Sequence, residues 1–450
     1  MPVNTRRIYT LNGLPPEVVA VAFAKCSRSP EPFDEIANEL NEDQSRQFHE
    51  KWVVGYGHSS VAEHAVLSIA LENVSILATK VIEDNRLASY TEKSSRYQPF
   101  DKSRYYRPEL DADMLKLYTE TVDYMLDTYT NLIPRMTAFI EDKYPDASKI
   151  SVRNKVFDNL RNMLPVSCLT NLGMTVNARS LAYAIVKLLT HPLKEMNEIG
   201  RELKEAALKV TPTLVKYTDY NTYLADTSEH LSALCRNMLD RTPEPTRSVM
   251  LVEHDENAVD KIVRALLYRF SRIPYTQVQN KVRAMSDAEK HDIIRQALDR
   301  RGDYDSPLRE FENTSYTFDI LVDYGAFRDI QRHRMMTQAH QDFTAQYGFT
   351  IPDEVLEAKL DEPYRECLHR SGKAYHVIAG RFPTEAQYVL AMAFRRRVLF
   401  TMNYRELFHF VKLRSSEHGH AAYRKIAQLM YSEVERVQPF LASFIPVNMS

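Results

Sequence analysis

The chain carries two altered copies of one series of motifs, and this internal repeat constrains the fold more than any other feature. Four matched blocks occur in the same order in both halves: His58–His64 with Tyr304–Glu310, Arg86 with Arg334, Ser94–Tyr97 with Thr344–Tyr347, and Met174–Leu181 with Phe400–Leu407. A repeated order of motifs is the signature of duplication. We therefore expect two homologous domains, residues 1–225 and 248–450, joined by a linker at 226–247.

Hydrophobic patterning predicts the fold class. Residues 65–71 and 315–324 alternate apolar and polar side chains, which is typical of strands. Most other segments have helical spacing, and we expect helices that include 178–190, 385–399 and 404–413. The sequence thus predicts an α+β fold with two homologous helix-rich domains, each with a small mainly antiparallel sheet. The linker contains aromatic and leucine residues, so it need not be a free tether.

Composition excludes several classes of protein. The net charge of −2 gives no overall basic field for a nucleic acid polymer, so any nucleotide must be bound by local arginines. The four cysteines are scattered without a Cys-x-x-Cys motif, which favours a reduced, cytoplasmic chain. The polar N-terminus and the lack of long apolar runs argue against a signal peptide or membrane span. The chain also lacks the glycine-rich motifs of Rossmann and P-loop nucleotide sites.

Arg332, His333 and Arg334 are three consecutive side chains that can each carry positive charge. Guanidinium groups pair with phosphates and stack on flat rings, and an imidazole can donate a hydrogen bond or take up a proton. These residues therefore suit an anionic, planar ligand. A solvated basic turn is the alternative, because charge runs usually lie on the surface. The altered second copy of the segment favours the binding site.

The ordered motifs resemble those of the flavin-dependent thymidylate synthases, and each half looks like one degenerate copy. The resemblance implies that a Ser-x-Arg-Tyr loop binds the deoxyuridylate (dUMP) substrate, which assigns Ser94 and Arg96 to the nucleotide. It also places Glu92 near the nucleotide and gives a phosphate-binding role to Arg161, four residues before Pro165. The alternatives are a solvated turn acid for Glu92 and a surface helix arginine for Arg161.

The resemblance also implies positions that contact the flavin (FAD). In the first half they are His58, Ser60 and Glu63, followed by Asn177 with Arg179. In the second half they are Asn403, Arg405, His409 and the Arg332–Arg334 triplet. An asparagine and an arginine two residues apart at the start of a helix could equally be a cap and a surface salt bridge.

Each half departs from the family pattern in a different place. In the first half the Arg-His-Arg triplet reads Asp84-Asn85-Arg86, and Leu188 stands where the second half has Arg414. In the second half Gln346 and Gln387 stand where the first half has Arg96 and Arg161. Tyr183 of the first half is replaced by His409. Each half therefore lacks residues that the other retains.

Because the resembled enzymes are homotetramers with shared sites, the sequence suggests a homodimer that forms a pseudo-tetramer with composite sites. Arg332, His333, Arg334 and Arg414 of one chain would then face Ser94, Arg96 and Arg161 of another, with His333, Arg334 and Arg414 in catalytic roles. The implied reaction converts dUMP to dTMP with FAD, methylenetetrahydrofolate and NADPH.

Two other functions stay open from the altered motifs. The chain could be a related flavoenzyme that acts on another nucleotide, or a non-catalytic protein that binds flavin or nucleotide. No metal site is expected, because His418-Gly419-His420 is too short and isolated for a zinc pattern.

Overall fold

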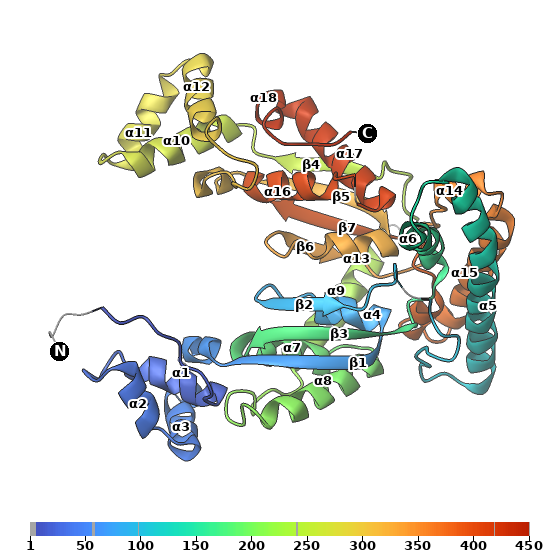
Figure 1. The fold of residues 1–450 in the computed structure, drawn as a ribbon, viewed down its shortest axis with the longest axis horizontal. Coiled ribbons are helices and arrows are strands. Elements are labelled where there is room, and N and C mark those ends of the chain that lie inside the picture. The colour runs from blue at the N-terminus through green and yellow to red at the C-terminus, as the bar shows by residue number, and fades with distance from the viewer. Residues whose placement is uncertain (1–5, 56–58, 98, 240–241, 418, 450) are drawn as a thin grey trace. The chain divides into compact units, whose positions relative to one another are not determined.

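The computed structural model describes residues 6–55, 59–97, 99–239, 242–417 and 419–449 (Figure 1). The chain divides into two compact units that interleave along the sequence. Unit 1 comprises residues 1–94, 103–111 and 167–243, and unit 2 comprises residues 95–102, 112–166 and 244–450. This division differs from the two sequence repeats, because residues 95–102 and 112–166 of the first repeat belong to unit 2.

Unit 1 contains a three-stranded antiparallel sheet in the order β1-β3-β2. Its strands are β1 (Val66–Ser75), β2 (Ala88–Glu92) and β3 (Leu169–Asn177). Its helices are α1 (Pro16–Lys25), α2 (Phe33–Glu39), α3 (Glu42–His49), η1 (Glu50–Gly55), η2 (Ser59–His64), α4 (Ile76–Ile82), α7 (Ala178–Leu189), α8 (Lys194–Leu208) and α9 (Thr222–Met238). The helices α7 and α8 pack on each other along their apolar faces.

Unit 2 contains a four-stranded antiparallel sheet in the order β4-β5-β7-β6. Its strands are β4 (Val249–His254), β5 (Tyr316–Asp323), β6 (Thr337–His340) and β7 (Arg395–Met402). Its helices are α5 (Ala112–Lys143), α6 (Lys149–Leu160), η3 (Arg161–Met163), α10 (Ala258–Phe270), α11 (Tyr275–Arg283), α12 (Asp287–Leu298), η4 (Arg309–Glu312), α13 (Tyr324–Ile330), α14 (Asp353–Glu357), α15 (Asp361–Ala379), η5 (Glu385–Val389), α16 (Tyr404–Arg414), α17 (Ala421–Val437) and α18 (Pro439–Ala442).

Apart from the additional strand β4, the two sheets share one topology, and they confirm the predicted α+β class with small antiparallel sheets. In each repeat a strand runs into a short buried helix, a second strand follows, and the central strand leads into the next helix. A hydroxyl pair joins equivalent positions of the first and central strands: Ser68 with Thr175 at 3.1 Å, and Thr317 with Thr401 at 3.0 Å. The short helices are both capped by the last residue of the strand, Ser75 or Asp323.

A short stretch of backbone pairing places the end of α6 within unit 2. The amide of Val166 donates to the carbonyl of Leu390 at 2.9 Å, and the amide of Ala393 donates to the carbonyl of Asn162 at 2.7 Å. Between them Pro165 faces Ala391 in an antiparallel bridge. These two residues are equivalent positions of the two repeats, so the repeats pair with each other here. The pairing positions Arg161, which begins η3.

One expectation from the sequence needs correction. The predicted helix at 385–399 is wrong, because η5 ends at Val389 and β7 begins at Arg395. Burial alternates along β7, but its first three side chains are arginines, which hides the period of two that identifies a strand. The predicted linker, which need not be a free tether, includes residues 226–238 of the helix α9. No helix among the described residues is long and apolar enough to cross a membrane.

Candidate functional site

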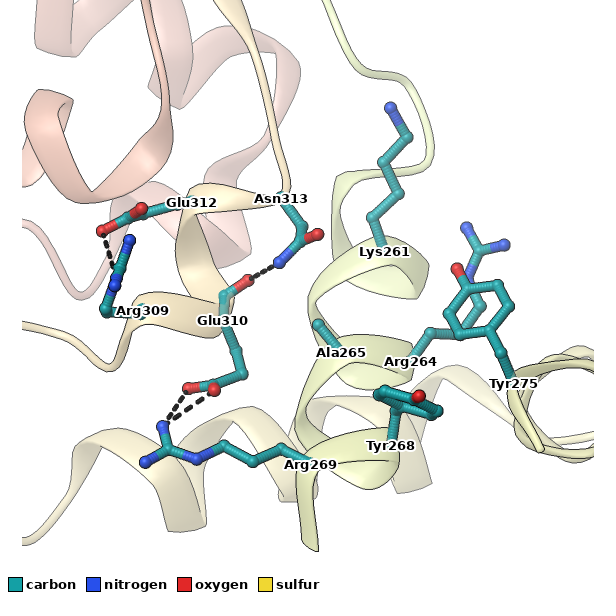
Figure 2. Close-up of a pocket in the computed structure, with 10 residues that line it drawn as sticks. All are labelled: Lys261, Arg264, Ala265, Tyr268, Arg269, Tyr275, Arg309, Glu310, Glu312 and Asn313. Carbon is teal, nitrogen blue, oxygen red and sulfur yellow. Dashed lines mark hydrogen bonds and ion pairs between the residues drawn. The ribbon is translucent and has the colours of Figure 1, made fainter. Parts of the chain in front are cut away.

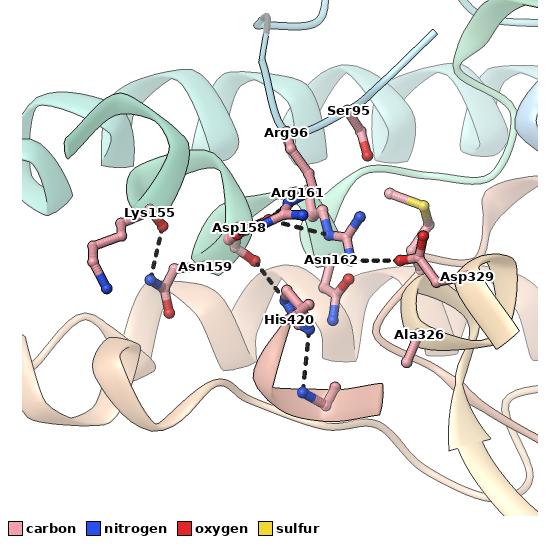
Figure 3. A network of polar contacts seen from close by, with 12 residues as sticks. Ser95, Arg96, Lys155, Asp158, Asn159, Arg161, Asn162, Ala326, Asp329 and His420 are labelled. Carbon is pink, nitrogen blue, oxygen red and sulfur yellow. Dashed lines mark hydrogen bonds and ion pairs between the residues drawn. The ribbon is translucent and has the colours of Figure 1, made fainter. Parts of the chain in front are cut away.

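Unit 2 gathers arginines from both repeats around two aspartates. Figure 3 shows the first-repeat arginines, Arg96 and Arg161, with both aspartates. We call this group the arginine cluster; it consists of Arg96, Asp158, Arg161, Asp329, Arg332, His333 and Arg414. Both oxygens of Asp158 accept hydrogen bonds from Arg96, from Nε and from Nη2, each at 2.6 Å. Such a fork holds a guanidinium in one plane and one direction.

Arg161 connects the two aspartates. Its Nη2 lies 3.4 Å from Oδ2 of Asp329, and its Nε lies 4.0 Å from Oδ1 of Asp158. The residue is only 3 % exposed, and its buried Nε has no hydrogen-bond partner among the described residues. A buried donor without a partner is unfavourable, and an anionic ligand at this position would satisfy it. The alternative of a surface helix arginine does not fit this burial.

Arg414 and His333 form the second-repeat side of the cluster. Arg414 Nε donates to His333 Nε2 at 2.9 Å, and Arg414 Nη2 donates to the backbone carbonyl of Asp329 at 2.6 Å. The other imidazole nitrogen, Nδ1, lies 3.1 Å from a Glu406 carboxylate oxygen. Since Nε2 accepts, Nδ1 carries the proton, and His333 is neutral. Burial, together with the Arg414 charge, holds the pKa of His333 below its usual value.

Asp329 lies in a strongly positive environment. Burial alone would raise the pKa of its carboxyl, but the charges of Arg161, Arg332, Arg328 and Arg414 lower that pKa to about 2. His420 lies next to the same group, and its Nε2 lies 3.3 Å from the Asp158 carbonyl. Burial and the Arg161 charge lower the pKa of His420 to about 4. His420 therefore stays neutral at pH 7, and the cluster carries more positive than negative charge.

Asp329→Asn is expected to lower the free energy of unfolding by about 2 kcal/mol at pH 7. Because folding depresses the pKa of Asp329, its stabilisation is complete above the unfolded-state pKa of about 3.9 and is lost as the pH falls through 2. The difference between wild type and variant should therefore shrink below pH 4. Urea unfolding followed by circular dichroism at a series of pH values measures it, with Asp299→Asn, at the exposed C-terminal cap of α12, as the control. A difference that does not vary with pH would contradict the electrostatic explanation.

The Arg332–Arg334 triplet lies in the turn between α13 and β6. The Arg332 side chain is exposed, Arg334 is half-buried, and His409 on α16 is exposed with its ring centre 5.4 Å from that of His333. Arg96 and Arg161 of the first repeat thus lie in one compact unit with Arg332, His333 and Arg414 of the second. The sequence had suggested that these groups meet across two chains, whereas the structure brings them together within one.

The predicted flavin positions form the same arrangement in both repeats. Asn177 caps α7 and Asn403 caps α16, each accepting a hydrogen bond from the backbone amide three residues on. Arg179 pairs with Glu63 of η2, and Arg405 pairs with Glu312 of η4. The alternative of a helix cap and a salt bridge therefore describes the geometry of both blocks.

The pairing also fixes how the first blocks of the two repeats correspond. Glu312 occupies the place of Glu63, so the second block extends to Glu312 and does not end at Glu310 as the sequence alignment had suggested. Ser60 and Glu63 are exposed in η2. His58 lies outside the described residues.

Glu92 is buried in unit 1, so the alternative of a solvated turn acid is wrong. Its carboxylate lies 3.2 Å from the Lys80 ammonium and accepts a hydrogen bond from the Thr79 hydroxyl at 3.3 Å. Lys80 is itself buried and also pairs with Glu83. The carboxylate therefore anchors the end of β2, two residues before Ser94, which is partly buried. Ser94 is the last residue of unit 1 in this segment.

An open groove of about 1040 Å³ lies between α10, α11 and η4 (Figure 2). Its lining side chains are mostly cationic, aromatic or acidic: Lys261, Arg264, Tyr268, Arg269, Tyr275, Arg309, Glu310 and Glu312, with Asn313 and Ala265. Glu310 accepts two hydrogen bonds from Arg269, at 2.8 and 3.0 Å. Glu312 joins the groove to α16 through Arg405, and the next residue of α16, Glu406, bonds to His333. The groove and the arginine cluster are thus connected through the first turn of α16.

The acidic residues and one histidine that organise this site were not predicted from the sequence. Asp158 lies one helical turn before Arg161, a spacing that allows an ion pair and could have been noticed. Asp329 lies three residues before Arg332, and nothing in its spacing indicates its contact with Arg161. Glu406 and His420 gave no signal, because their partners are distant in sequence. The described residues contain no group of three or more His, Cys, Asp or Glu that could hold a metal ion.

Comparisons with known proteins match both repeats. A family model described as thymidylate synthase complementing protein matches residues 10–213 and again residues 250–440. A UPF0159 protein of Chlamydia muridarum is 33% identical over 97% of this chain and 91% of its own length. A flavin-dependent thymidylate synthase of Clostridium tetani is 29% identical over 47% of this chain and 84% of its own length.

A solved structure shows a further match. It is a flavin-dependent thymidylate synthase from Helicobacter pylori complexed with FAD and dUMP, and it covers 45% of this chain and 100% of its own chain. The identity is 14% and the TM-score is 0.34.

Proposed function

The chain belongs to the thymidylate synthase complementing protein family, and we propose that it is a flavin-dependent thymidylate synthase with one composite site per chain. It converts dUMP to dTMP, using FAD as the cofactor and methylenetetrahydrofolate and NADPH as co-substrates. The site is the arginine cluster, to which each repeat contributes the residues that the other repeat has lost.

The main support for the proposal is the pattern of site residues that each repeat has retained or lost. The retained residues of both repeats, Arg96, Arg161, Arg332, His333 and Arg414, all belong to unit 2. Their counterparts in the other repeat are Gln346, Gln387, Asp84, Asn85 and Leu188, and none of these carries a positive charge. Decay of two unused sites would scatter the losses over both. Retention of one complete set favours a single working site.

The cluster suits the 5′-phosphate of a nucleotide. Arg96 and Arg161 would bind the phosphate, because a dianion can take the place of the aspartate oxygens that now hold them. The buried Arg161 Nε, which lacks a hydrogen-bond partner among the described residues, would gain one. Ser94 and Glu92 stay predicted nucleotide contacts on the strength of the resemblance.

Arg414 and His333 would act at the pyrimidine. A fixed guanidinium can stabilise negative charge that develops on a uracil carbonyl. Arg414 donates one hydrogen bond to His333 and another to the backbone carbonyl of Asp329. These two bonds fix the orientation of its guanidinium group. Both imidazole nitrogens of His333 are already bonded, and we therefore assign His333 the role of positioning Arg414. Arg334 is proposed as a further catalytic group of the same turn.

The flavin would supply the reducing equivalents when bound, and the protein residues would hold and orient it. Arg332 and Arg334 suit its diphosphate, and Asn403, Arg405 and His409 lie on the adjacent α16. The groove beside Arg405 contains exposed tyrosines and arginines that can stack on flat rings. His58, Ser60, Glu63, Asn177 and Arg179 are proposed flavin contacts of the first repeat. No cysteine nucleophile is required, and burial raises the pKa of Cys367 to about 12.

Three measurements test this function. The purified chain should take up FAD with a yellow absorbance and should form dTMP from dUMP, methylenetetrahydrofolate and NADPH. It should also allow a thymidine-requiring strain to grow without thymidine. A yellow protein that forms no dTMP would favour a flavoenzyme for another nucleotide. A protein that binds neither FAD nor dUMP would overturn the proposal.

A further inference from the structure

Gly325, the second residue of α13, is buried where η3 of the first repeat meets α13 within unit 2. A Cβ atom at this position would overlap with Oδ1 of Asn162 and would lie 3.1 Å from its Cγ. On its other side the same Cβ would lie 3.2 Å from Oδ1 of Asp323. All three contacts are closer than ordinary van der Waals contact. Any side chain at residue 325 would therefore displace one of these two neighbours.

Asn162 has little room to give way (Figure 3). It is 2 % exposed, and its Nδ2 donates to Oδ1 of Asp323 at 3.3 Å. Its carbonyl accepts from the amide of Ala393 at 2.7 Å, and the Gly325 amide donates to the carbonyl of Met392 at 3.0 Å. Rotation of the Asn162 amide about its last bond would leave Cγ in place. Both sides of the contact are thus held by backbone bonds to the same segment.

This close approach belongs to one combination of the repeats. Two residues after the strand residue that caps each short helix, the first repeat has Leu77 and the second has Gly325. At the position that follows Arg161 and its counterpart, the first repeat has Asn162 and the second has the larger Tyr388. The smaller residue at each position therefore occurs in the combination that brings Arg161 to α13.

We propose that Gly325 is a positioning residue of the composite site, because the absence of a side chain lets η3 lie against α13 and places Arg161 beside Asp329. Arg161 directly precedes Asn162, and Asp329 lies one helical turn after Gly325. A displacement of about 1 Å is enough to weaken a fixed contact with a ligand severely. The inference rests on the proposed function for the identity of the ligand, dUMP, whereas the placement of Arg161 does not.

Gly325→Ala is expected to raise the Kd for dUMP by about 10-fold or more. Gly325 does not have a positive φ, so alanine strains no backbone there, and alanine normally favours a helix over glycine. A loss of affinity therefore reports the contact with Asn162. KM for dUMP should rise with Kd, while kcat changes by less than about 2-fold, because a displaced phosphate ligand weakens ground-state and transition-state binding equally.

The second variant combines Gly325→Ala with Asn162→Ala, which removes the side chain that the new methyl group would meet. Asn162→Ala alone loses the bond to Asp323 and should raise the Kd for dUMP about 3-fold. The double variant should match this single variant, so the two effects are not additive. Gly380→Ala at the end of α15 is the matched control, because its Cβ would meet only a backbone carbonyl at 3.4 Å. Isothermal titration with dUMP measures each Kd.

Amide hydrogen exchange of residues 162–166 gives a second measurement that needs no ligand. We expect faster exchange in Gly325→Ala than in wild type, and a return to the rate of Asn162→Ala in the double variant. A Gly325→Ala chain that binds dUMP as tightly as wild type would overturn the inference, as would a double variant that binds no tighter than Gly325→Ala. If the wild type does not bind dUMP, the proposed function fails, and unchanged exchange in Gly325→Ala then overturns the placement of η3 separately.

Discussion

Arg161→Ala is expected to lower kcat/KM for thymidylate formation by about 100-fold or more, whereas Gln387→Ala leaves it unchanged. The two residues occupy the same position of the two repeats, but only Arg161 belongs to the arginine cluster. Its guanidinium is buried and fixed between two aspartates, so it can pair with a phosphate without losing further side-chain freedom. The loss should appear in both KM and the dissociation constant for dUMP.

Two further measurements separate binding from stability in Arg161→Ala. The variant leaves Asp329 with one guanidinium fewer, so its unfolding by urea should be compared with that of the wild type. Arg161→Lys keeps the positive charge but lacks the forked donors, and we expect it to recover only part of the affinity for dUMP. Equal activity of wild type and Arg161→Ala would exclude the arginine cluster as the nucleotide site. A loss of activity in Gln387→Ala would show that a second site is in use.

The sequence alone was sufficient to predict the duplication, the fold class and the arginines that the two repeats retain. These depend on local patterns, such as alternation in 65–71 and 315–324 and the spacing of Arg161 before Pro165. The predicted strands occur as β1 and β5. β3 and β7, the central strands, were not recognised. Burial alternates along both strands, but their backbones pair on both edges with residues far apart in sequence.

The grouping of the retained residues within one chain could not be predicted. It depends on residues 162–166 pairing with 390–393, which places η3, with Arg161 at its start, beside α13 in unit 2. No local sequence pattern specifies this backbone pairing, because residues 162–166 could equally pair with the equivalent segment of another chain. The acidic residues were not predicted for a related reason. The sequence shows which residues are cationic, but only the tertiary fold determines which carboxylates, such as Asp329 and Glu406, lie beside them and orient them.

The role of His333 shows a further limit of motif reading. Its place between two arginines suggested an imidazole that meets the ligand or takes up a proton. In the structure one nitrogen accepts from Arg414 and the other bonds to Glu406. A buried imidazole with both nitrogens occupied is suited to holding a neighbour in place. Only the geometry distinguishes these two roles.

Mixing the Arg96→Ala and Arg332→Ala chains is expected to restore less than about 1% of wild-type activity. Arg96 and Arg332 belong to the same compact unit of one chain, so each substitution damages the site of its own chain. A mixture then contains only damaged sites, whether or not the chains associate. The two variants can be expressed together with different tags, and the mixed species can be purified by both tags in turn.

A site shared between chains would give the opposite result. In a randomly mixed dimer population, half of the dimers would contain both variants, and each of these would have one of its two sites intact. Activity would then return to about one quarter of the wild type in the unfractionated mixture, and to about one half in the purified mixed dimer. Wild type expressed with Arg96→Ala provides the control, because its activity shows that a damaged chain does not inhibit its partner. Recovery near one quarter would therefore place Arg96 and Arg332 of each working site on different chains, and would exclude the composite site that we assign to unit 2.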